Sequence, residues 1–162
     1  MRKVNFILTT AIVLLTGCTS QNVVKLNDTV VKANDDLRIA ADLFNKKFEA
    51  VADYNYTIIE KERQVLVALI DKKVKEVAAL KAEMPGGEDF KNAFVDYYKF
   101  ERDIYDTDFK NICLIAGKDE IGKLSEIALQ MKEKTGREDA MEKKIHAEQE
   151  NYARKNNLKL NH

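Results

Sequence analysis

The sequence predicts an all-α protein, an antiparallel up-down four-helix bundle that follows an N-terminal signal peptide. Apolar residues recur every three or four positions from Val23 to Tyr152, which is the period of helices with one buried face. Charged residues make up 33% of the 162 residues and proline occurs once, which favours long solvated helices over strands. Short links between four such segments are most simply accommodated by an up-down bundle.

The first helix is predicted from a continuous apolar stripe. Its positions are Val23, Leu26, Val30, Ala33, Leu37, Ala40, Phe44, Phe48 and Val51. No glycine or proline occurs between Cys18 and Met84, so one continuous helix of about 100 Å is an open alternative. A break at Asp53-Tyr54-Asn55-Tyr56 is favoured, because this stretch is turn-like and Thr57 with Glu60 fits a capping box.

A second helix is then expected from about residue 57 to 84, and Pro85-Gly86-Gly87 predicts a chain reversal after it. Glu88 and Asp89 place negative charge on the first turn of the third helix, where the helix dipole favours it. This helix carries most of the aromatic residues. Its stripe consists of Phe90, Phe94, Tyr97, Glu101, Ile104, Tyr105, Ile112 and Ile115.

The fourth helix is expected between Ile121 and Tyr152, with Gly117 as the C-terminal cap of the helix before it. A glycine inside a helix costs about 1 kcal/mol, so a kink or break is expected at Thr135-Gly136. The tail, residues 156–162, is expected to fray. An even number of antiparallel helices returns the chain to its starting end.

The first seventeen residues have the three parts of a secretory signal. Met1-Arg2-Lys3 is positively charged, Val4 to Leu15 is mostly apolar, and small residues precede Cys18. The apolar run is about a dozen residues long, whereas a membrane-spanning helix needs about twenty. The leader is therefore expected to direct export, and it is a poor transmembrane anchor.

Leu15-Thr16-Gly17-Cys18 resembles the lipobox of the bacterial lipoproteins. The resemblance implies cleavage between Gly17 and Cys18, a thioether from Cys18 to diacylglycerol, and acylation of the new amino group by a fatty acid such as palmitate. Several acyl chains, at about 0.8 kcal/mol per buried methylene, make release from a bilayer negligible. The alternative is a secreted protein with a chance cysteine after its leader. The mature part is also broadly similar to helical envelope lipoproteins of unknown function.

The expected organisation is a signal peptide at 1–17, a lipidated tether at 18–22, a helical bundle at 23–155 and the tail at 156–162. Arg2 and Lys3 lie in the leader, which leaves 25 basic and 27 acidic residues and a formal charge of −2. This balance gives no indication of a nucleic-acid partner. Cys113 is the one thiol left after lipidation, which excludes an intramolecular disulfide, and its apolar neighbours indicate a small core residue.

The tether after Cys18 contains no acidic residue. In lipoproteins of Gram-negative bacteria this pattern implies delivery to the outer membrane. The resemblance therefore implies a location on the periplasmic face of the outer membrane, with the cell surface as the second choice.

The least ordinary stretch is Asp96–Phe109, in which five acids and five aromatics share fourteen residues. A cation site or a partner-binding face is one hypothesis, with Asp96, Glu101, Asp103, Tyr97 and Tyr105 as its residues. The favoured alternative is an amphipathic helix whose aromatics pack in the core and whose acids face water. Glu101 lies close to the apolar stripe, and we expect it to be buried beside an Arg or Lys of a neighbouring helix.

No catalytic or metal-binding motif is found. A Glu-x-x-His pair, a Cys pair, a nucleophile elbow and a glycine-rich phosphate loop are all missing, and His146 is the only histidine of the predicted bundle. No catalytic residue, metal or cofactor is therefore expected.

The sequence favours a non-enzymatic, lipid-anchored envelope protein that binds an unknown protein partner or has a structural role. The alternative is a small-ligand or cation-binding protein, or an enzyme, that uses the acidic, tyrosine-rich face of the third helix. A host-directed antigen or adhesin is a third hypothesis, and only its membrane topology separates it from the first.

Overall fold

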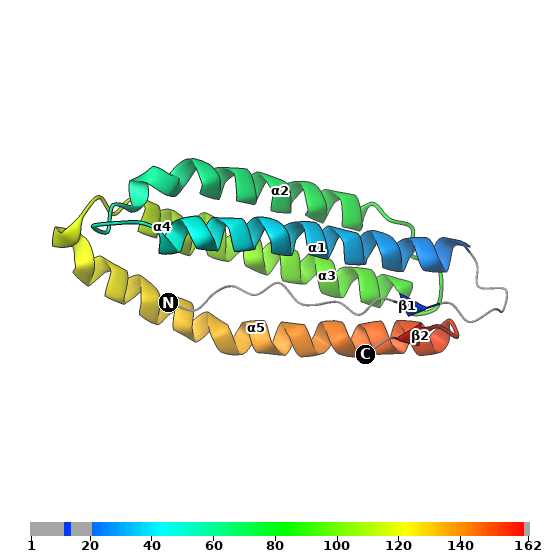
Figure 1. Ribbon diagram of the computed structural model, residues 1–162. Helices are drawn as coiled ribbons and strands as arrows, with labels where there is room; N and C mark the ends of the chain where they lie inside the picture. The colour runs from blue at the N-terminus through cyan, green and yellow to red at the C-terminus, as the bar shows by residue number, and fades with distance from the viewer. Residues whose placement is uncertain (1–11, 14–20, 161–162) are drawn as a thin grey trace.

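The structure is a computed structural model, and its described residues are 12–13 and 21–160 (Figure 1). The signal peptide cleavage site, Gly17 and Cys18, lies outside them. The protein is all-α, with four long helical segments packed against one another. They are α1 (Gln21–Glu49), α2 (Glu60–Ala78), the segment that begins with α3 (Gly87–Asp103), and α5 (Ile121–Lys155). The predicted fold class is confirmed.

The third segment changes its helical type along its length. α3 leads into a π-helix, η2 (Ile104–Phe109), and then into α4 (Lys110–Cys113). Short 3-10 turns, η1 (Tyr56–Ile59) and η3 (Lys118–Glu120), precede α2 and α5. A two-residue antiparallel ladder pairs β1 (Ile12–Val13) with β2 (Lys159–Leu160).

The break between the first two helices is confirmed. Asp53 and Tyr54 have φ angles of 53° and 58°, in the left-handed region, which ends the helical path. The backbone amide of Tyr56 donates to the carbonyl of Ile115 at 2.9 Å, so this turn is fixed to the loop before α5. The predicted capping box is wrong, because the hydroxyl of Thr57 donates to Asn55 Oδ1 and the cap residue of α2, Ile59, makes no side-chain cap bond.

Three other boundary predictions are wrong. α2 ends at Ala78 rather than near 84, and the loop after it packs on the start of α3, where the Lys91 ammonium donates to the Leu80 carbonyl at 3.2 Å. Gly117 is not the C-terminal cap of the third helical segment, because that cap is Leu114, three residues earlier; Gly117 has extended backbone and is the N-cap of η3. α5 passes through Gly136 without a break, and residues on both sides of it contact the third segment: Lys134 pairs with Asp108 at 2.9 Å and Arg137 covers the Phe100 ring at 5.2 Å.

The start of α1 and the end of α5 lie at one end of the bundle, which we call the near end (Figure 1). The hydroxyl of the buried Tyr152 donates to the Val23 carbonyl at 2.7 Å, and its ring stacks on Phe90 at 4.8 Å. The Asn156 side chain donates to the Pro85 carbonyl at 2.8 Å, and Leu158 is buried, so these residues of the predicted frayed tail contact the bundle. The opposite, distal end carries the loops at 50–59 and 114–120.

The core follows the predicted stripes. Seven of the nine residues of the first predicted stripe are buried: Val23, Leu26, Val30, Ala33, Leu37, Phe44 and Phe48. Among the described residues, no helix has an apolar run long enough to cross a bilayer.

Two glycine substitutions test these backbone assignments. Gly86 has φ of 75°, and an added Cβ would lie 3.2 Å from the Lys155 side chain, so Gly86→Ala should lower the free energy of unfolding by about 1 kcal/mol.

Gly136→Ala should raise the free energy of unfolding by up to about 1 kcal/mol, because its Cβ would meet nothing within 4 Å in a continuous helix. Urea unfolding measures both. A destabilising Gly136→Ala would argue against the continuous α5.

Candidate functional site

The five residues of the predicted cation or partner face do not form one exposed face. Tyr97 and Tyr105 are fully buried, whereas Asp96 and Asp103 are exposed and lie beside lysines of α5. The carboxylate of Asp96 is 3.6 Å from the Lys144 ammonium, and that of Asp103 is 3.0 Å from the Lys134 ammonium. For these four residues the structure matches an amphipathic helix with aromatics in the core and acids in water.

Glu101 is the exception, because it is an acid with no exposed surface. Its carboxyl faces Glu138, Tyr97 and Glu142, and burial followed by the charge of Glu138 raises its pKa well above the ordinary value. The expectation of a buried carboxyl is therefore confirmed. The expectation of an Arg or Lys beside it is wrong, since the neighbouring helix brings acids to this position. A buried carboxyl that faces other acids is most stable when it holds a proton.

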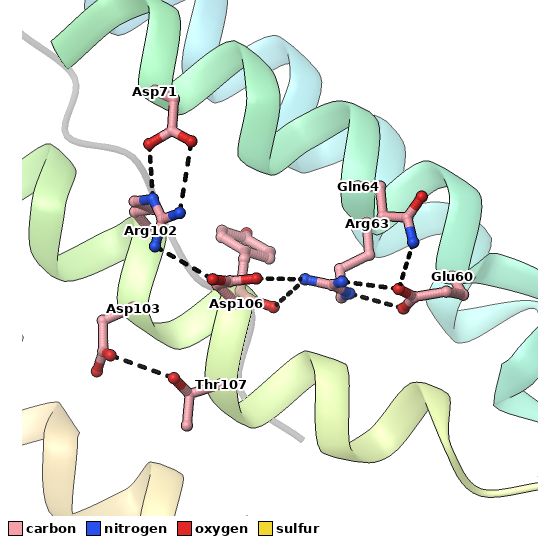
Figure 2. A network of polar contacts seen from close by, with 9 residues as sticks. Glu60, Arg63, Gln64, Asp71, Arg102, Asp103, Asp106 and Thr107 are labelled. Atoms are coloured by element: carbon pink, nitrogen blue, oxygen red, sulfur yellow. Dashed lines mark hydrogen bonds and ion pairs between the residues drawn. The ribbon is translucent and has the colours of Figure 1, made fainter. Parts of the chain in front are cut away.

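The best-organised polar cluster centres on Arg63, which the sequence analysis did not single out (Figure 2). The Arg63 side chain is only 4% exposed. It donates two hydrogen bonds of 2.7 Å to the carboxylate of Glu60, one of 3.1 Å to Asp106 and one of 3.2 Å to the Tyr105 carbonyl. Paired bonds from a guanidinium to a carboxylate are among the strongest polar contacts in proteins. Arg63 therefore fixes α2 against the π-helix.

A second arginine extends the same network (Figure 2). Arg102 donates to Asp71 at 2.6 Å and to the second oxygen of Asp106 at 3.2 Å, so Asp106 links the two arginines. The hydrogen bonds from Arg63 lower the pKa of Glu60 to about 2. At pH values above the ordinary carboxyl pKa this pairing stabilises the fold, and its contribution is lost as the pH falls towards 2. The sequence contains one indication of this role, since Arg63 lies between the apolar residues Ile59 and Leu66 at spacings of four and three, which places a charge within an apolar stripe of the second helix.

Arg63 and Arg102 join α2 to the third helical segment, and the thiol of Cys113 lies beside this network at Glu60. Cys113 is buried, and burial followed by the nearby charge of Glu60 raises the pKa of its thiol to about 12. A thiol that stays protonated at neutral pH is a poor nucleophile, so the prediction of a small core residue is confirmed.

In the part of the chain that the structure describes, no group of three His, Cys, Asp or Glu residues is arranged to hold a metal ion.

Large apolar side chains are exposed on the two distal loops, in a region that we call the distal surface. Tyr54 and Ile58 lie on one loop, and Leu114 and Ile121 lie on or next to the other, with exposed fractions from 40% to 69%. The loops are joined by a backbone bridge between Asn55 and Ala116 and by an ion pair of 3.0 Å between Lys118 and Asp53. The distal surface is therefore formed by connected segments that lie far apart in the sequence.

Among the described residues, two grooves are lined by none of the residues of the distal surface. One lies between α1 and α2 and has a volume of about 360 Å³; we call it the α1–α2 groove. The other, of about 290 Å³, lies at the near end between the start of α1 and the loop after α2. Their lining residues belong to α1, α2 and the loop after α2, and none comes from the tyrosine-rich part of α3.

Comparison with protein families, with curated proteins and with solved structures finds no match for this chain.

A change at Glu101 tests the buried acid. Because its folded-state pKa is raised, Glu101 supports the fold fully below its ordinary pKa, and this support falls as the pH rises. Glu101→Gln should therefore raise the free energy of unfolding at pH 8 more than at pH 5, as measured by urea unfolding. Asp96→Asn, on the exposed part of the same helix, is the control. Equal changes at both pH values would contradict the assignment.

Proposed function

We propose that this protein is a bacterial envelope lipoprotein, anchored by lipid on Cys18, whose non-enzymatic helical bundle binds a protein partner at the end away from the membrane. The anchor rests on the resemblance of Leu15-Thr16-Gly17-Cys18 to a lipobox. Two residues, Thr19 and Ser20, separate Cys18 from α1, which begins at Gln21, so such an anchor would hold the near end close to the bilayer. The periplasmic face of the outer membrane is the proposed location.

The main support for partner binding is the uneven distribution of exposed apolar side chains. Within the described ranges, the exposed large apolar residues are Ile39, Leu43, Tyr54, Ile58, Val65, Leu114, Ile121 and Leu129. All eight lie in the distal half of the bundle. Tyr54, Ile58, Leu114 and Ile121 form the distal surface on the joined loops, whereas the other four lie along α1, α2 and α5. Clusters of exposed apolar side chains mark interaction sites, and aromatic residues are favoured there.

The alternative, a cation or ligand site on the third helix, has weaker support. Its exposed acids, Asp96 and Asp103, lie beside lysines, and its tyrosines are enclosed in the core. Binding there would require separating an ion pair or opening the bundle. Calorimetry with calcium, magnesium or manganese would revive this alternative if it gave heat and a higher melting temperature.

Cys18→Ala tests the anchor. The variant should lose metabolic labelling by a palmitate analogue and move from the membrane fraction to the soluble fraction, because several acyl chains provide the attachment. Cys113→Ala should keep both properties, since that thiol is enclosed in the core. The wild-type protein should resist protease added to intact cells. Labelling that persists in Cys18→Ala would overturn the anchor, and digestion on intact cells would place the protein on the cell surface.

Leu114→Glu tests the distal surface. Leu114 is 69% exposed, so the charge should leave the fold intact while placing a carboxylate in the proposed interface. Crosslinking in native membranes, followed by mass spectrometry, should give a reproducible partner whose yield falls at least tenfold in this variant. Leu129→Glu, at a comparably exposed position on α5, is the matched control. Equal loss in both variants, or no reproducible partner of the wild type, would contradict the proposal.

A further inference from the structure

The α1–α2 groove has an apolar body and a charged end. The buried Phe44 and Leu66 form its floor, Ala40 and Leu69 are partly exposed, and the exposed Leu43 and Val65 form its walls. Lys47, Lys61 and Glu62 complete the lining, and all three lie towards the distal end of the two helices. The groove therefore changes from apolar to charged along its length.

Ion pairs between α1 and α2 bracket the groove. At its charged end, the Lys47 ammonium donates to Glu62 at 2.9 Å, and beyond its apolar end the Lys73 ammonium donates to Asp36 at 2.7 Å. The two pairs are eleven residues apart on each helix, which is about 16 Å along the axis at 1.5 Å per residue. An occupant that lies along the groove between these pairs is limited to about this length.

The volume of the groove decides between two kinds of occupant. A helix of this length and about 10 Å in diameter fills about 1,250 Å³. This is more than three times the 360 Å³ of the groove. A single extended hydrocarbon chain, about 4.5 Å across from the contact distances of carbon atoms, fills about 250 Å³ over the same length. The groove therefore has room for one extended chain, whereas the body of a helix would lie outside it.

Only one of the two ends has a net charge. Lys47 and Lys61 against Glu62 leave one net positive charge at the end that lines the groove. At the other end, Lys73 lies 2.7 Å from Asp36 and 3.2 Å from Glu76, and Lys72 lies 3.7 Å from Glu76, so the charges there balance. A ligand with one anionic end is therefore directed with that end towards Lys47 and Lys61.

We propose that the α1–α2 groove binds one fatty-acid anion, with its carboxylate beside Lys47 and Lys61 and its chain between Leu43 and Val65. Each carbon of an extended chain advances about 1.3 Å, from a bond of about 1.5 Å, so a length of about 16 Å corresponds to twelve to fourteen carbons. This binding is separate from the proposed partner binding at the distal surface, and either activity can be present without the other.

Photocrosslinking with a diazirine derivative of tetradecanoate tests the site. The lipidated wild-type protein, reconstituted in nanodiscs, should be labelled on the facing surfaces of α1 and α2, with mass spectrometry locating the label. Tetradecanoate should compete with the probe. Tetradecyl trimethylammonium, with the same chain and a cationic head, and hexanoate, with a shorter chain, should each compete at least tenfold less well, since the site needs both charge and buried methylenes.

Variants of the groove separate this site from adventitious labelling. Leu43→Glu and Val65→Glu replace side chains that are more than half exposed, so the bundle should keep its melting temperature while labelling falls at least tenfold. Lys61→Glu makes the charged end of the groove net negative, so it should reduce labelling by the fatty-acid probe and increase labelling by a cationic probe of equal chain length. Leu129→Glu, on α5, should leave labelling unchanged.

Four results would overturn the proposal. Label outside α1 and α2, or labelling unaffected by Leu43→Glu, would show that the groove is not the site. Equal competition by the cationic amphiphile would exclude recognition of the carboxylate. Loss of a protein crosslink in Leu43→Glu with fatty-acid labelling intact would show that a protein partner uses this face instead.

Discussion

The packing of aromatic side chains from the third helical segment determines how the other helices are placed. On α1, Phe44 makes edge contacts with Tyr105 at 5.5 Å and with Phe109 at 5.1 Å. At the near end, Phe90 stacks on Tyr152 of α5 at 4.8 Å. Buried aromatic rings remove 150 to 250 Å² each from water and prefer specific geometries, so these contacts fix position as well as stability. The shared near end of α1 and α5 follows from this arrangement.

The π-helix lets polar residues of the same segment reach two different neighbours. Asp106 in η2 contacts Arg63 of α2, whereas Asp108, two residues later, contacts Lys134 of α5 at 2.9 Å. Asp108 is buried, and an unpaired carboxylate there would cost several kcal/mol, so its lysine is required. The polar contacts on both sides hold the wider turn in place while Tyr105 and Phe109 remain in the core.

The sequence was sufficient for the parts of the fold that depend on local periodicity. The stripe of α1, the turn at Asp53 and the reversal at Gly86 all follow from residue type and spacing. The environment of Glu101 and the π-helix could not be predicted, because both depend on how α3 and α5 are aligned. The role of Arg63 could be predicted from the sequence only in part. Its place in an apolar stripe shows that it is unusual, but its partner Asp106 is 43 residues away.

The two ends of the bundle face different physical requirements under the proposed anchoring. Exposed apolar side chains next to a bilayer would partition into it and tilt the bundle, whereas polar side chains would keep it upright. Asn22, Lys25 and Lys81 line the groove at the near end, and those large apolar side chains of that half that the structure describes are enclosed or partly covered. The distal half has no such constraint, and it exposes Ile58 and Leu114 at a cost in solubility. A fold stabilised mainly by its aromatic core tolerates this exposure, which leaves the distal loops available for recognition.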